Sequence, residues 1–117
     1  VNAQRAKYGL TALEMGDDNL TAAAQTRAEE IAVVNSHVRP DGSKCFTVLK
    51  DYGVTDTPTG ENAAWGSVSP EEVVNAWMNS EGHRANILDP EARAMGVGYY
   101  YNSSSTWGHQ WIQLFTK

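Results

Sequence analysis

Apolar residues recur along the chain at a helical spacing in one region and at strand spacing in others. The longest helical pattern covers residues 17–34, where Asp17, Asp18 or Asn19 can cap the first turn. The positions that we expect to be buried are Leu20, Ala23, Ala24, Ala28, Ile31 and Val34. The opposite face carries Gln25, Arg27, Glu29 and Glu30. Because alanine is small, this helix can lie close against a sheet.

A second helical pattern begins at Ser69 and has clear starting signals. Ser69 is the expected N-cap, Pro70 takes the first helical position, and Glu72 completes a capping box. Gly82 is the expected left-handed end of this region, just before His83.

Two shorter helical segments are expected, and glycines mark their ends. Residues 1–8 form the end of a helix that stops at Gly9, and residues 46–52 form a short helix that stops at Gly53. Pro40 and Gly42 indicate a turn after the long helix.

Three segments have the composition of strands: residues 61–65, 95–101 and 106–116. The last has apolar side chains on both parities, with Trp107 and Trp111 on one and Ile112 on the other, so we expect both of its faces to be covered. The predicted fold class is α+β, a three-layer α-β-α sandwich around a small antiparallel sheet of about three strands.

Length and charge narrow the class of protein. The 117 residues suit one domain spanning 1–117, and we expect a monomer. A net charge of -5 without a basic cluster excludes the usual nucleic-acid binder. No segment has the length and apolar character of a membrane span. The chain begins at Val1 within a helical pattern, so we expect it to be trimmed from a longer precursor.

Three residues could form a polar site if their elements converge. His37 follows the long helix, Glu61 opens a strand after Gly60, and His83 follows the second helix. Two imidazoles and a carboxylate suit a divalent cation such as zinc, or acid-base chemistry. Structural roles compete with this hypothesis: a histidine after a helix commonly caps carbonyl groups, and Arg84 can hold a loop. His109 is expected to be packed or half-exposed.

Nucleophilic catalysis has weaker support. Ser36 and Ser43 lie outside any GxSxG motif, which argues against a serine hydrolase. Cys45 is the sole cysteine, so it makes no internal disulfide, and a buried apolar role suits it better than that of a thiol nucleophile.

Five sequence blocks together resemble the CAP superfamily of cysteine-rich secretory, antigen 5 and pathogenesis-related proteins, in its bacterial disulfide-free branch. The blocks are VNAQRAKYGL, SHVRPDGS, GENAAWG, EEVVNAWMNSEGHRANIL, and MGVGYYY followed by WIQLF. The resemblance covers essentially the whole chain and implies a three-layer α-β-α sandwich.

The resemblance also implies a central cleft, lined in many members by two histidines and two acids that can bind zinc. His37 matches the first histidine and Glu61 the acid of the GEN motif, whereas Ser80 and Gln110 stand where the second acid and second histidine are expected. His83 is the candidate for restoring a second imidazole, and Arg84 adjoins it in the candidate cleft.

The resemblance implies an extracellular or cell-envelope protein. Family members are associated with lipids, sterols, peptides and partner proteins. We therefore expect a domain that binds a small molecule, lipid, peptide, protein partner or divalent cation in this cleft. The alternative is a metal-assisted, peptidase-like hydrolase, with Glu61 as base and His37 and His83 as metal ligands.

Overall fold

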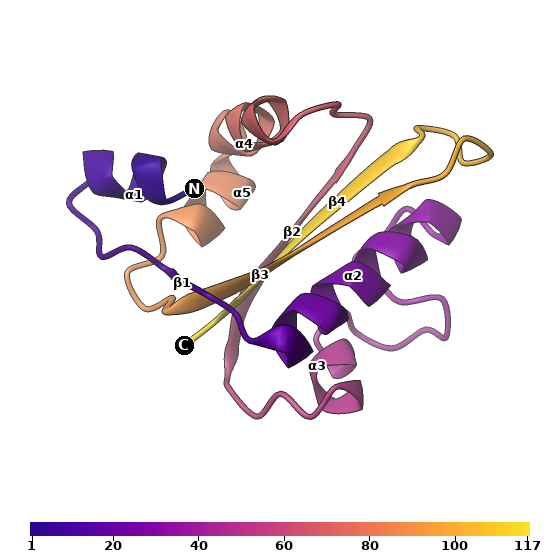
Figure 1. Cartoon of the computed structure of the whole chain (residues 1–117), viewed down its shortest axis with the longest axis horizontal. Coiled ribbons are helices and arrows are strands. Elements are labelled where there is room, and N and C mark those ends of the chain that lie inside the picture. Colours follow the sequence, from indigo (N-terminus) through magenta and orange to yellow (C-terminus); the bar gives the residue numbers. More distant parts are fainter.

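The computed structural model describes residues 1–117, folded as a sheet with helices on both faces (Figure 1). The elements in chain order are α1 (Asn2–Lys7), β1 (Glu14–Met15), α2 (Asp18–Val33), α3 (Thr47–Asp51), β2 (Pro58–Trp65), α4 (Pro70–Met78), α5 (Glu81–Ile87), β3 (Ala94–Tyr101) and β4 (His109–Thr116). Helices α2 and α3 lie on one side of the sheet, and α1, α4 and α5 lie on the other.

The sheet has four strands in the order β1-β3-β4-β2. β4 pairs antiparallel with β2 and with β3, as predicted, but β1 pairs parallel with β3, so that Glu14 lies opposite Ala94. The predicted three-stranded antiparallel sheet is therefore a four-stranded mixed sheet. A two-residue strand is too short to leave a periodic pattern in the sequence.

Each face of the sheet packs its own hydrophobic core. On the α2 side the core contains Leu20, Ala23, Ala24, Ala28, Ile31, Val48, Leu49, Ala63, Ile112 and Leu114. On the other side it contains Leu13, Val73, Trp77, Ile87, Ala92, Met95, Trp111 and Phe115. β4 contributes to both cores through alternate residues, which confirms that this strand is covered on both faces.

Two glycines in β3 let α2 lie close to the sheet. A Cβ atom at Gly98 would lie 2.2 Å from the Ala24 carbonyl oxygen, and one at Gly96 would lie 2.7 Å from the Leu20 carbonyl oxygen. Both contacts are with helix backbone, which cannot move aside as a side chain can. The small residues of α2 and these glycines together bring the helix and the sheet into close contact.

Several predicted element ends are confirmed. Ser69 Oγ accepts the Glu72 amide at 3.1 Å, and Pro70 begins α4. Gly9 and Gly53 follow α1 and α3 with left-handed φ angles of 72° and 70°. These residues end their helices as the sequence indicates.

Other expectations are wrong. Gly82 lies inside α5, without a left-handed φ, because the chain turns at Asn79 and Ser80 and then resumes a helix. The final strand begins at His109, so Trp107 precedes it and is 57% exposed. Val34 lies beyond the end of α2 and is also exposed. None of the helices combines the length and the apolar character that crossing a membrane requires.

Candidate functional site

Glu61 is an almost fully buried carboxylate on the edge strand β2. Its side chain is 1% exposed and faces the α2 layer, as does Ala63 two residues later. Both carboxylate oxygens are bonded to Arg27: Nε donates to Oε2 at 2.8 Å and Nη2 donates to Oε1 at 3.1 Å. This bidentate pair lets a charged acid be buried at the sheet edge.

His37 makes the third contact with this carboxylate. Its Nδ1 atom lies 2.7 Å from Oε1 of Glu61, while its side chain remains 54% exposed. The hydrogen bond to Glu61 raises the pKa of His37 above its ordinary value, against the opposing effects of burial and of the Arg27 charge. The structure thus brings together His37 and Glu61, two of the three residues of the site hypothesis.

The protonation of the pair follows from its surroundings. Burial raises the pKa of Glu61, but hydrogen bonds from His37 and Arg27, together with their charges, lower it by more, and the net pKa is below the ordinary value. The carboxylate is ionised at neutral pH, so it accepts and His37 Nδ1–H donates. Neutral His37 consequently keeps its free electron pair on Nε2, which makes no hydrogen bond within the chain.

Arg27 belongs to the candidate site, although the sequence did not lead us to expect it there. We placed it on the solvent face of α2, but it is fully buried. Besides Glu61, it donates from Nη1 to Glu30 at 2.9 Å and from Nη2 to the Ser36 carbonyl at 3.1 Å. Helix spacing could have identified it, because it lies four residues after Ala23 and four before Ile31, on the buried stripe.

A second arginine fixes the loop that carries His37. Arg39 donates to Oε2 of Glu30 from Nε at 3.0 Å and from Nη2 at 2.8 Å, and it also pairs with Asp51 at 2.8 Å. Hydrogen bonds to Glu30 and Asp51 raise its pKa. Glu30 thus joins Arg27 to Arg39, and the polar cluster extends from the sheet edge to α3.

The neighbouring residues of the GEN motif serve the opposite face of the sheet. Asn62 is fully buried, donates to the His83 carbonyl at 3.1 Å and to Gln113 at 3.2 Å, and accepts from Asn86 at 2.9 Å. A Cβ at Gly60 would lie 2.4 Å from Oδ1 of Asn86, so glycine leaves room for that side chain. Alternation along β2 therefore sends Glu61 to the α2 layer and Asn62 to the α5 layer.

His83 lies in α5, which packs on the opposite face of the sheet from α2. Burial lowers its pKa, and the positive charge of His37 lowers it further. His83 is partly buried, and its backbone carbonyl is the group held by Asn62. Approach of the His83 ring to Glu61 itself stays a prediction.

The remaining candidate site residues belong to α5 and β4. Ser80 is the N-cap residue of α5 and makes no side-chain capping bond, and Arg84 is exposed without a salt bridge. Gln110 is buried, and its side-chain amide lies 2.9 Å from Ser105 Oγ, where it supports the β3–β4 hairpin. It pairs with Trp65, four residues along β2 from Glu61, which is about 13 Å at strand spacing.

Cys45 and His109 have the structural roles expected of them. Cys45 is buried, and burial followed by the charge of Glu61 raises the pKa of its thiol to about 11, so it is neutral and a poor nucleophile. His109 is half-buried at the far end of the sheet, where its Nδ1 lies 2.7 Å from the Tyr99 hydroxyl.

The site does not fit a three-ligand metal centre in this arrangement. No three or more His, Cys, Asp or Glu side chains are grouped to hold an ion. Both oxygens of Glu61 already accept hydrogen bonds, and the Arg27 guanidinium beside them would repel a cation. The Glu61 carboxylate instead orients the His37 imidazole through the hydrogen bond to its Nδ1 atom.

The sequence of the chain places it in a known family. Residues 1–115 match the Cysteine-rich secretory protein family, CAP, and the chain belongs to that family. It is 42% identical over 113 residues to the uncharacterised protein YkwD of Bacillus subtilis (strain 168), covering 95% of this chain and 43% of YkwD. The chain thus spans less than half the length of that relative.

Solved structures have the same fold. An extracellular protein containing a SCP domain from Bacillus anthracis superposes with a TM-score of 0.85 at 26% identity, covering 99% of this chain and 37% of that one. An outer surface protein from Borrelia burgdorferi gives a TM-score of 0.84 at 24% identity, covering 99% of this chain and 85% of that one.

Proposed function

We propose that this CAP domain is an extracellular or cell-envelope binding module, and that His37 anchors its ligand. Its family and the extracellular SCP-domain protein from Bacillus anthracis support the location. The match covers only 37% of the Bacillus anthracis protein. What we say of the activity of the whole protein is therefore part of this proposal.

The observation that carries the proposal is the hydrogen bond of 2.7 Å between His37 Nδ1 and Glu61. A half-exposed histidine would ordinarily rotate freely, but a buried and ionised carboxylate holds this ring in one orientation. The ring therefore presents Nε2 at a fixed place beside strand β2. Such pre-organisation lowers the entropy that a ligand must overcome on binding.

Two kinds of ligand match this group. A polar group of a small molecule or peptide can hydrogen-bond to Nε2, which donates when His37 is protonated and accepts when it is neutral. A divalent cation could instead bind Nε2 with His83 and water, with Glu61 orienting His37 rather than binding the ion. The lowered pKa of His83 favours its neutral form, which metal binding requires.

Zinc and a chelator distinguish these ligand types in one thermal unfolding experiment. A cation site predicts that zinc raises the melting temperature, that the chelator reverses the increase, and that His37→Ala removes it. His109→Ala is the matched control, because His109 lies at the far end of the sheet. Equal responses of wild type and His37→Ala would rule out a cation anchored at His37.

Binding of a polar group of a small molecule or peptide to His37 is tested by a second experiment. A library of short peptides and small polar molecules is screened by NMR, with the His37 ring signals as the reporter. A true ligand shifts those signals in wild type and loses affinity in His37→Ala. Ligands that bind both proteins equally would contradict the role proposed for His37.

Hydrolysis is the second candidate function. The specific observation in its favour is the same Glu61–His37 pair, since a carboxylate that orients an imidazole is a common arrangement for a general base. In this hydrolase, His37 would be the general base and Glu61 would orient it. From the sequence we had expected Glu61 to be the base. Turnover of a peptide library that is lost in His37→Ala would support it.

A further inference from the structure

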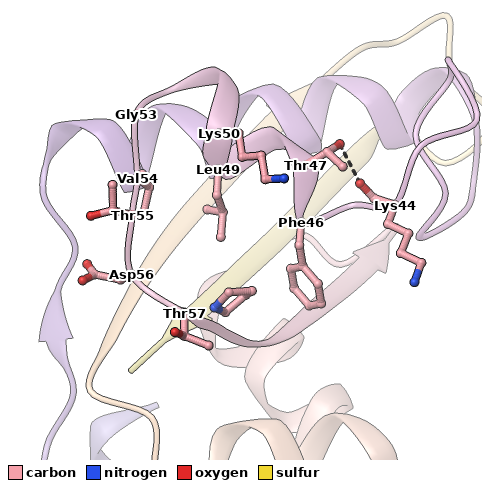
Figure 2. Close-up of a pocket in the computed structure, with 11 residues that line it drawn as sticks. Lys44, Phe46, Thr47, Leu49, Lys50, Gly53, Val54, Thr55, Asp56 and Thr57 are labelled. Atoms are coloured by element: carbon pink, nitrogen blue, oxygen red, sulfur yellow. Dashed lines mark hydrogen bonds between the residues drawn. The ribbon is translucent and has the colours of Figure 1, made fainter.

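A pocket lies on the α2 side of the molecule, between α3 and the segment that leads into β2. Figure 2 shows this pocket, which has a volume of about 680 Å³. Its lining residues are Lys44, Phe46, Thr47, Leu49, Lys50, Gly53, Val54, Thr55, Asp56, Thr57 and Pro58. It shares no residue with the His37 site, and its size falls in the range of small-molecule sites.

The frame of the pocket is held in place from several sides. The Tyr52 hydroxyl bonds to Thr26 of α2, and the Val54 amide donates to the Leu49 carbonyl at 2.8 Å. The Lys117 amide donates to the Thr57 carbonyl at 2.9 Å, which ties the loop to the chain end. The cavity is therefore largely formed before any ligand enters.

The interior of the pocket is apolar. Leu49 is 3% exposed and forms part of the α2-side core, while Phe46 and Val54 are half-buried against that core. Figure 2 shows the Phe46 ring extending into the pocket opposite Thr57. These side chains suit a compact apolar body such as an aromatic ring.

The charge at the rim is unequally distributed. The chain has four lysines, and two of them, Lys44 and Lys50, line this pocket. Neither forms a salt bridge, and in Figure 2 they lie on either side of Phe46. Asp56 lies on the opposite side of the opening. Two free ammonium groups in a protein of net charge -5 make one side of this pocket locally positive.

We propose that this pocket binds a small molecule with a compact apolar body and one anionic group. The apolar body lies against Phe46, Leu49 and Val54, and Lys44 and Lys50 pair with the anion. Because both lysines are exposed, their pairing with a ligand is screened by salt and contributes modestly, while apolar burial supplies most of the affinity.

An aromatic sulfonate, anilinonaphthalene sulfonate, is a suitable probe because its fluorescence rises in apolar sites. We expect saturable binding of one molecule to the folded domain. The double substitution Lys44→Gln and Lys50→Gln should weaken binding by roughly fivefold to tenfold. Lys7→Gln in α1, on the other side of the sheet, should leave binding unchanged. Asp56→Asn should strengthen binding.

A neutral probe separates the two parts of the proposal. Phenylnaphthylamine lacks the sulfonate, so it should bind more weakly than the anionic probe, and equally to wild type and the double variant. Raising salt from ~0.05 M to ~0.5 M should weaken binding of the sulfonate to wild type alone. His37→Ala tests whether the probe uses the other site, and this variant should bind it as wild type does.

Three results would overturn the proposal: no saturable binding, equal affinity of wild type and the double variant for the sulfonate, or loss of sulfonate binding in His37→Ala. Failure of the zinc and peptide experiments on His37 would leave these outcomes unaffected. The two sites are thus tested independently.

Discussion

Arg27 and Glu61 form a buried ion pair, with side chains 0% and 1% exposed, that joins helix α2 to the edge strand of the sheet. Both oxygens of Glu61 are bonded to Arg27, and one is also bonded to His37. The buried Glu61 carboxylate, held by Arg27, thereby raises the pKa of His37 at the surface.

Removing Arg27 should destabilise the domain strongly. Arg27→Ala leaves the Glu61 carboxylate buried without its main partner, which costs about 3 to 5 kcal/mol of unfolding free energy. Urea unfolding measures this loss. Glu29→Ala, an exposed acid on the same helix, is the control and should change stability by less than ~0.5 kcal/mol. Equal effects of the two substitutions would contradict the burial of the pair.

Two glycines should respond oppositely to alanine. Gly98→Ala places a methyl group against the Ala24 backbone and should cost about 1 to 3 kcal/mol or more. Gly82→Ala adds a methyl group in open space within α5 and should stabilise by roughly 0.4 to 1 kcal/mol. Thermal unfolding checks both values. Destabilisation by Gly82→Ala would instead support the left-handed helix end first expected there.

The Glu61–His37 pair gives stability a defined pH dependence. The pKa of folded Glu61 is lowered, so its contribution is present above the unfolded pKa of ~4.3 and is lost as pH falls through the folded value. The pKa of folded His37 is raised, so its contribution is complete below ~6.5 and is lost as pH rises through the folded value. The pair should contribute most between about pH 4.3 and 6.5.

Comparing His37→Gln with its parent protein measures this contribution. Both proteins carry His83→Gln, because His83 titrates in the same range and would otherwise mask the effect. The stability difference should be largest near ~5.5, within the window where both charged forms are favoured, and should decline toward a pH of ~8. A difference that is constant over this range would contradict the coupling of His37 to Glu61.

Much of the fold could be predicted from local signals. Ser69 and Pro70 mark the start of α4, and Gly9 and Gly53 mark helix ends. The apolar residues of both parities in β4 indicate that this strand is covered on both faces. These features depend on residues that are close together in the chain, so they can be predicted from local sequence patterns. β1 pairs with the distant strand β3 and is too short to show a pattern.

The site could be predicted in part. His37 and Glu61, two of the three residues of the site hypothesis, are hydrogen-bonded in the structure, while the place of the His83 ring in that site stays a prediction. Arg27 was missed because a charged residue was assigned to the solvent face by its type, although its helical position is on the buried stripe. Burial of that arginine depends on Glu61, which lies 34 residues further along the chain.

The decisive measurement is an NMR titration of the histidine rings, because our main conclusion is that Glu61, held by Arg27, raises the pKa of the half-exposed His37. In wild type, the pKa of His37 should lie above ~6.5 and that of His83 below it. His37→Ala assigns the signals, and it should also raise the pKa of His83, because a nearby positive charge is removed. A His37 pKa at or below that of His83, or a His83 titration unchanged by His37→Ala, would contradict the account.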